Sequence, residues 1–372
     1  MKQTLYKYLF GAISAALIIL TSACTPKDRY ITITGFAQGG TYSVKMNLKG
    51  ASVPPEEIRD SIDAILVDID NSLSGYNSKS LLSQFNAGGT IKPDSIFIDI
   101  YSKAYEIYEE TDGAVDVAAG PLFDLWGFGF SEGDMPSDEK IAVTMEDCGL
   151  KMLVKDLKKV MVFDKLNPYS IYRSDMNPFA FDYEAEEYQL DRVYLLPKLN
   201  YNAIAQGYSC DLVARYLYSI GVKDMLVDIG EIFCDGVNPS GQPWSLGIDK
   251  PVDGNQELGA QMQGIFRAPA GPHGIVTSGN YRKFYVKDGK KYAHTIDPRT
   301  GYPADHNLLS ATIVAPDATM ADAYATYCMV IGLEESKRFL ESRPDLEGCL
   351  IYDDNNEFCT WCSSGFTLIE GQ

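Results

Sequence analysis

The chain has 372 residues, and its 51 Asp and Glu side chains outnumber its 32 Lys and Arg side chains, which gives a formal charge of −19. This balance excludes nucleic acid as a main partner, because binding to a polyanion depends on Lys and Arg displacing its counterions. Hydrophobic residues make up 45% of the chain and aromatic residues 12%, which excludes wholesale disorder. We expect a globular protein of two domains or of one large two-lobed domain.

The first 23 residues have the pattern of an export signal. Two lysines precede an apolar run over 9–20, about a dozen residues, which suits a signal peptide and is shorter than the roughly 20 residues of a membrane-spanning helix. The run ends in Leu20-Thr-Ser-Ala-Cys24, similar to a bacterial lipobox, whose cysteine is acylated and becomes the new N-terminus. The alternative is an ordinary signal peptide with a chance cysteine. We expect a lipid on Cys24, a short tether over 24–29, and attachment to a membrane of the bacterial cell envelope.

Seven cysteines remain beyond Cys24. Their number is odd and their positions are scattered, so no disulfide framework is indicated even in an oxidising compartment. Cys359 and Cys362 have the spacing of redox or half-zinc sites, but no second pair accompanies them and the chain has only three His. We interpret them as two cysteines of a C-terminal strand that can pair with each other.

Hydrophobic periodicity and turn residues predict a mixed order of strands and helices. In chain order, the predicted elements are strands over 30–34 and 41–48, a helix that begins at Pro54 and Pro55 and carries apolar residues to Leu73, helices over about 95–110 and 209–220, and a hairpin turning at 288–289. This order indicates the α+β class. Residues 163–195 are rich in Tyr, Asp and Asn and show no clear period, so we interpret them as an insertion on a loop.

A ten-residue segment from His294 to Pro303 concentrates chemically active side chains. It places an imidazole (His294), a carboxylate (Asp297) and a guanidinium (Arg299) beside a Pro- and Gly-containing turn. Arg299 and the backbone amides of such a loop can hold an anion. The alternative is a hairpin exit in which Asp297 caps the turn and pairs with Arg299.

Asp322 and Thr326 stand four residues apart in an Ala-rich segment. On a helix they share one face, where a carboxylate and a hydroxyl offer hard oxygen ligands for Mg²⁺ or Ca²⁺. The structural alternative is that Asp322 caps the helix and that Thr326 bonds back to a carbonyl.

Two further segments could contact a ligand. Residues 203–208 place a Gly-containing turn before a helix, whose free amides favour phosphate. Residues 111–129 place small residues ahead of an aromatic cluster, which could form a flat slot for a ring system or could be ordinary core packing.

These segments, in this order, resemble the ApbE family of FAD:protein FMN transferases. The resemblance spans about 35–332 and adds several shorter motifs: Gly40–Val44, Ser74–Tyr76, Phe85–Asn86, Gly207–Tyr208 with Asp211, Pro243–Trp244 and Thr277–Gly279. It implies an ApbE-like two-lobed α+β domain over 30–372, with mixed, largely antiparallel sheets and packed helices. It also implies transfer of FMN from FAD to a Thr or Ser hydroxyl of an exported electron-transport flavoprotein, with release of AMP.

The resemblance further implies a set of binding residues. Mg²⁺ would be held by Asp322, Thr326 and the backbone carbonyl of Ala203, with Ala325 close by. Flavin contacts would come from Gln38, Tyr76, Val117, Ala118, Ala119, Asn200, Gln206 and Ile296. Among the catalytic candidates, His294 would accept the proton of the acceptor hydroxyl, with Asp297 as its rival, and Arg299 would help Mg²⁺ to offset the charge of FAD.

Three positions depart from the family pattern. The family usually has an acidic residue at Asn200, Lys or Glu at Gln206, and Gly at Glu231. Neutral side chains still offer hydrogen bonds, so FAD binding can survive while transfer is slowed or hydrolysis is favoured. An FAD pyrophosphatase giving FMN and AMP, and a non-catalytic flavin-binding lipoprotein, therefore remain as alternatives.

Overall fold

The computed structural model describes residues 29–129, 135–146, 148–157, 165–167, 171, 198–252, 261–281, 284–287 and 290–370. The expected signal peptide, Cys24 and nearly all of the insertion expected over 163–195 lie outside these residues. No helix within the described ranges combines the length and the apolar character that crossing a membrane requires.

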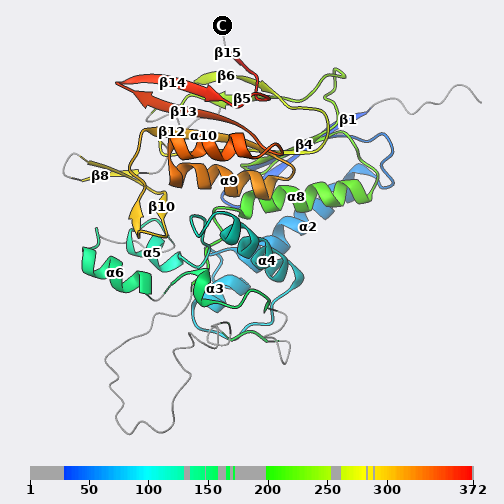
Figure 1. The fold of residues 1–372 in the computed structure, drawn as a ribbon. Coiled ribbons are helices and arrows are strands. Elements are labelled where there is room, and N and C mark those ends of the chain that lie inside the picture. The colour runs from blue at the N-terminus through cyan, green and yellow to red at the C-terminus, as the bar shows by residue number, and fades with distance from the viewer. Residues whose placement is uncertain are drawn as a thin grey trace, which may run out of the picture.

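One large antiparallel sheet forms the centre of the fold (Figure 1). Its eight strands, in spatial order, are β1 (Tyr30–Ala37), β2 (Gly40–Asn47), β3 (Met225–Asp228), β4 (Ile232–Asp235), β7 (His273–Gly279), β12 (Leu308–Ala315), β13 (Glu347–Asp354) and β14 (Glu357–Cys362). All neighbouring strands in it run antiparallel. The N-terminal hairpin and the C-terminal hairpin therefore occupy opposite edges of the same sheet.

Three smaller antiparallel sheets accompany it. The first contains β15 (Leu368–Glu370), β6 (Met262–Arg267) and β5 (Ser245–Asp249), in that spatial order. The second pairs β10 (Ile296–Asp297) with β11 (Tyr302–Pro303), and the third pairs β8 (Phe284–Lys287) with β9 (Lys290–Ala293). The first of these covers one face of the large sheet, because Trp244 and Phe266 share a core cluster with Ile275 and Ile351.

Helices cover the other face of the large sheet in two layers (Figure 1). The layer next to the sheet contains α8 (Ala205–Ser219), α9 (Ala318–Ile331) and α10 (Leu333–Ser342). Helix α2 (Pro55–Leu73) continues this layer, since Arg59 donates to the Thr34 carbonyl of β1 and Asp63 accepts from the Tyr42 hydroxyl of β2. Beyond lie α3 (Leu81–Asn86) and α4 (Ser95–Glu110), and to one side lie α5 (Gly120–Leu125), α6 (Asp138–Glu146) and the short 3₁₀ turn η1 (Leu150–Met152). The main core cluster joins α2, α4 and α8 to β2 and β3.

The predicted α+β class and its largely antiparallel sheets are confirmed. The helix over 95–110 has the predicted bounds, with the Asp94 side chain accepting a hydrogen bond from the Phe97 amide. It ends where Asp112 and Gly113 adopt positive φ angles of 48° and 75°. The predicted helix over 209–220 begins four residues too late, because the Ala205 amide already bonds to the Tyr201 carbonyl at 2.8 Å.

Cys359 and Cys362 lie on a C-terminal strand as predicted, but they do not pair with each other. All seven described cysteines are free thiols. Cys359 and Cys362 are three residues apart on β14, so their side chains point to opposite faces of the sheet. Across the ladder Cys359 lies opposite Tyr352, and Cys362 lies opposite Cys349.

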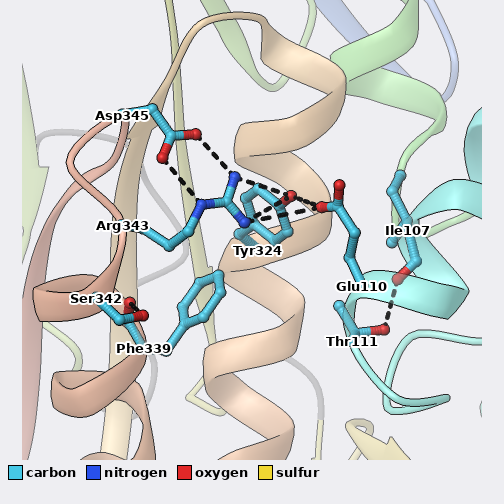
Figure 2. Close-up of polar contacts among 8 residues, drawn as sticks. All are labelled: Ile107, Glu110, Thr111, Tyr324, Phe339, Ser342, Arg343 and Asp345. Atoms are coloured by element: carbon cyan, nitrogen blue, oxygen red, sulfur yellow. Dashed lines mark hydrogen bonds and ion pairs between the residues drawn. The ribbon is translucent and has the colours of Figure 1, made fainter.

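A polar cluster around Tyr324 ties three separate elements together (Figure 2). The Tyr324 hydroxyl on α9 donates to the Glu110 carboxylate at the end of α4 and accepts from both terminal nitrogens of Arg343, at 3.4 and 3.5 Å. Arg343 also binds Asp345 through two hydrogen bonds of 2.9 and 2.7 Å, and its guanidinium lies 5.2 Å from the centre of the Tyr324 ring. The cluster connects α4, α9 and the chain between α10 and β13.

Replacing Tyr324 by Phe should lower the free energy of unfolding by about 1 kcal/mol, because the ring and its cation–π contact remain while the hydrogen bonds to partly exposed charged groups are lost. Urea unfolding measures this change. Tyr327→Phe on the same helix is the matched control, since the Tyr327 hydroxyl has no hydrogen bond to any described residue and its ring packs on Phe339 at 4.9 Å. Equal losses in the two variants would contradict a role for the cluster.

Candidate functional site

Helices α8 and α9 cross in close contact at Gly207. A Cβ atom at this position would lie 2.2 Å from the Ala318 carbonyl oxygen and 2.9 Å from Cβ of Asp322, so any larger residue would push the helices apart. The close approach lets the Gly207 amide donate a hydrogen bond of 3.1 Å to Oδ2 of Asp322. A buried carboxylate of α9 is thereby fixed against the first turn of α8.

A second carboxylate, Asp211, lies one turn further along α8. It accepts hydrogen bonds from the amides of Ala318 and Thr319, both at 2.9 Å, and from the Thr319 hydroxyl. Burial raises the pKa of Asp211 to about 6, and the neighbouring Asp317 charge adds to the shift. Burial likewise raises the pKa of Asp322 to about 8, opposed by the Gly207 amide and reinforced by Asp211. This pair of buried acidic groups favours a cation nearby.

The structural alternatives for Asp322 and Thr326 do not hold. The N-terminus of α9 is capped by Asp317, which accepts from the Met320 amide at 2.8 Å, so Asp322 is not the cap. The Thr326 hydroxyl makes no hydrogen bond back to a carbonyl of any described residue. Oδ1 of Asp322 accepts no hydrogen bond from any described residue. Because the two residues are four apart on α9, their oxygens share a face of the helix.

These residues fit a hard cation by the chemistry of their donors. Asp322 offers a carboxylate oxygen, Thr326 a hydroxyl, and Ala203 a carbonyl in the turn that precedes α8. Ala325 is fully buried and contributes to the apolar side of α9. Within the described residues, no three His, Cys, Asp or Glu side chains form a metal cluster. Such a set suits Mg²⁺, which commonly keeps few protein ligands and takes the rest from phosphate and water.

Two predicted flavin residues lie at the start of α8: Gln206 belongs to the helix, and Gln38 contacts it. The side-chain amide of Gln38, in the β1–β2 turn, donates to the Ser209 hydroxyl. Gln206 donates to the Ile229 carbonyl at 3.3 Å, and its amide nitrogen would be 2.4 Å from a Cβ at Gly230. The neutral Gln206 side chain therefore packs over the backbone of Gly230. The next residue is Glu231, at a position where the family usually has Gly.

The predicted flavin contacts at Asn200 and Val117–Ala119 are neighbours. The Asn200 amide donates to the Val117 carbonyl at 2.7 Å, and both segments are buried. Asp116 fixes the second of them by accepting from the Ala118 amide at 2.8 Å and from the Leu150 amide. Tyr76 differs, because it is 75% exposed on the turn after α2.

In the turn that follows His294, Asp297 and Arg299 form an ion pair with each other. Asp297 accepts from Nε and Nη2 of Arg299 and from the Arg299 amide, each at 2.9 Å. This arrangement is the alternative in which the segment is a hairpin exit. Both oxygens of the Asp297 carboxylate accept hydrogen bonds from Arg299. The pair raises the pKa of Arg299 through its hydrogen bonds to Asp297. The His294 ring lies edge-on to Phe128, with ring centres 6.5 Å apart.

The aromatic segment near residue 126 is core. Trp126 is 3% exposed, stacks on Tyr292 with ring centres 6.0 Å apart, and donates to the Gly301 carbonyl at 2.8 Å. Ile296, predicted to touch flavin, is 1% exposed in the same cluster. Core packing is thus the observed role of Trp126, and it attaches the 294–303 turn to α5 and α6.

Sequence reasoning missed the supporting residues Asp211, Ser209 and Asp116 as members of the site. Asp211 lies four residues after Gly207, and that helical spacing was the available signal. A groove of about 490 Å³ is lined by Asp211, Arg215 and Tyr218 among others, and by neither Asp322 nor Thr326. It does not mark the predicted metal position.

Comparison with known proteins identifies the family of this chain. Residues 38–350 match the ApbE family. An "FAD:protein FMN transferase" of Escherichia coli is 33% identical over 316 residues, which cover 83% of this chain and 81% of that protein. The protein of the same name from Haemophilus influenzae is 29% identical, with 97% of both chains covered.

Two solved structures have the same fold. The flavin transferase ApbE from Vibrio cholerae superposes with a TM-score of 0.70 and 27% identity, covering 91% of this chain and 98% of that one. The Pseudomonas stutzeri flavinyl transferase ApbE in its apo form gives 0.72 and 28%, covering 91% and 95%. The fold and the curated relatives define an enzyme of the transferase class, as predicted. The chain belongs to the ApbE family.

Proposed function

We propose that this chain transfers FMN from FAD to a Thr or Ser hydroxyl of an exported electron-transport flavoprotein, with Mg²⁺ and with release of AMP. The observation that carries the proposal is the buried Asp322 carboxylate held by the Gly207 amide at the α8–α9 contact, in a chain whose relatives bear the name FAD:protein FMN transferase. A chain of charge −19 needs a local cation to admit the FAD pyrophosphate.

The reaction forms one phosphoester bond and breaks one phosphoanhydride bond. The acceptor hydroxyl oxygen attacks the FMN-side phosphorus of FAD, and AMP leaves with the bonding electron pair. When bound, Mg²⁺ stabilises negative charge that grows on the phosphate oxygens. Asp322 and Thr326 would hold the metal, and Gln38, Gln206, Asn200 and the Val117–Ala119 backbone would position the flavin nucleotide.

The proton of the acceptor hydroxyl goes to His294 rather than to Asp297. Both Asp297 oxygens accept hydrogen bonds from Arg299, so this carboxylate is already engaged as the partner of a guanidinium. An imidazole can accept a proton near neutral pH. We therefore assign the proton to His294. Asp297 then orients Arg299, which adds positive charge beside the pyrophosphate.

The proposal is tested by incubating the detergent-solubilised full chain with FAD, Mg²⁺ and an acceptor flavoprotein. We expect the intact mass of the acceptor to increase by one phosphoester-linked FMN, with one AMP released for each FMN transferred. AMP release without a change in acceptor mass would instead identify an FAD pyrophosphatase. FAD binding without AMP release would identify a non-catalytic flavin protein.

His294→Gln provides the catalytic control in the same assay. It should slow FMN transfer by about 100-fold or more while FAD affinity is retained, as expected for loss of a general base. Full transfer activity in this variant would assign the proton to another group.

The metal assignment predicts a dependence of Mg²⁺ binding on pH. Because the folded pKa of Asp322 is about 8 against an unfolded value of 3.8, the metal-free protein should lose stability as pH rises between these values. Mg²⁺ must displace a proton at pH 6 but not at pH 9, so its affinity should be on the order of 100-fold weaker at pH 6. Thermal unfolding with and without Mg²⁺ at both pH values measures this.

Two Asn variants separate the ligand from its surroundings. Asp322→Asn should abolish the Mg²⁺-induced rise in melting temperature, whereas Asp317→Asn on the same helix should preserve it, because Asn remains a good N-cap. An undiminished Mg²⁺ effect in Asp322→Asn would refute the metal assignment.

We also propose that the chain is anchored by lipid on Cys24 in a bacterial cell envelope. The support is the short apolar run that ends at this cysteine. Cys24→Ser should move the protein from the membrane fraction to the soluble exported fraction, as measured by fractionation and immunoblotting. Retention of this variant in the membrane through its own N-terminus would refute lipid anchoring.

A further inference from the structure

Two cysteines face each other across the C-terminal edge of the large sheet. Cys349 on β13 and Cys362 on β14 are direct partners in the antiparallel register. Direct partners place their side chains on the same face of the sheet. Cys349 is buried at 1% exposure, while the half-buried Cys362 packs against the same core cluster between the two sheets. The chain between them is the β13–β14 hairpin, so they are also close in sequence.

The ladder places this pair at one of its close positions. The neighbouring pair, Gly348 and Ser363, is joined by a backbone hydrogen bond of 2.9 Å from the Ser363 amide to the Gly348 carbonyl. Hydrogen-bonded and non-hydrogen-bonded pairs alternate along an antiparallel ladder, so Cys349 and Cys362 form a non-hydrogen-bonded pair. Such pairs have Cα atoms about 4.5 Å apart, which lies within the range of about 4.4 to 6.8 Å that a disulfide requires.

We propose that Cys349 and Cys362 are a modification site that forms a cross-strand disulfide and fastens the edge strand β14 to β13. Neither the ApbE resemblance nor the flavin chemistry assigns any role to these residues. The exposure of Cys362 lets an oxidant reach this sulfur first, and Cys349 lies directly behind it. In an oxidising compartment, this arrangement yields an intramolecular bond rather than a lasting mixed disulfide.

The oxidation balances with a disulfide-containing oxidant. The Cys362 thiolate attacks the oxidant, which forms a mixed disulfide and releases one thiol. Cys349 then loses its proton and attacks the Cys362 sulfur, which releases the second thiol. Two protons and two electrons thus pass from the cysteines to the oxidant. The thiol–thiol hydrogen bond lowers the pKa of Cys362 and, together with burial, raises that of Cys349, which fits this order of attack.

Peptide mapping of the full chain tests the proposal directly. The reduced protein is freed of reductant, incubated with oxidised glutathione, denatured in acid, alkylated and digested. We expect a peptide pair joined through Cys349 and Cys362, separable only after reduction. Because the oxidant is supplied in the tube, the result depends neither on export nor on FMN transfer.

Cys359 provides a matched control on the same strand, because it lies opposite Tyr352 and has no thiol partner across the ladder. Cys359→Ser should form the same linked peptide pair, and its melting temperature should rise by a few degrees on oxidation, as in the unmodified chain. Cys362→Ala should show neither. Free alkylation of both Cys349 and Cys362 after oxidation, a persistent glutathione adduct on Cys362, or a bond to Cys359 would overturn the proposal.

Discussion

Helices α8 and α9 meet at Gly207 with no space for a side chain between them, and the site depends on that contact. The first turn of α8 carries Gln206 and, through Ser209, holds the Gln38 side chain of the β1–β2 turn. Helix α9 carries Asp322 and Thr326. The hydrogen bonds from Gly207 to Asp322 and from the start of α9 to Asp211 fix the register between the helices. A shift of either helix would therefore separate the proposed metal ligands, Asp322 and Thr326, from the residues expected to hold the nucleotide.

Local elements were predictable where one physical signal dominated. Apolar residues at helical spacing up to Leu73 identified α2, and hydrophobic periodicity with turn residues placed α4 over about 95–110. The N-cap Asp94 of α4 was not predicted. The order of strands was not predictable, because β2 pairs with β3 and β7 with β12 across long stretches of chain. Periodicity shows which face of a strand is buried but not which strand lies beside it. The cysteine pairing failed for the same reason, since the partner of Cys362 lies across the ladder.

The candidate site was predictable in its residue types and not in its internal partners. Asp322 could have been a helix cap, and only the structure assigns that role to Asp317. Asp297 could have been a base or an ion-pair partner, and the structure shows it bound to Arg299. Trp126 could have formed a slot for a ring or part of the core, and it stacks on Tyr292. Trp126 was decided by a neighbour distant in sequence, whereas the Asp297 and Asp322 alternatives were decided by local hydrogen bonds, and residue spacing alone reveals neither.

The order of synthesis of the site follows from where its two helices lie along the chain. Helix α8 ends at Ser219 and α9 begins at Ala318, so the carboxylate and its anchoring amide belong to segments that leave the ribosome far apart in time. A chain that lacks α9 would therefore leave the Gly207 amide without Asp322, and Asp211 without the amides of Ala318 and Thr319. The contact on which the site depends is therefore completed late in synthesis, in whichever compartment the chain folds.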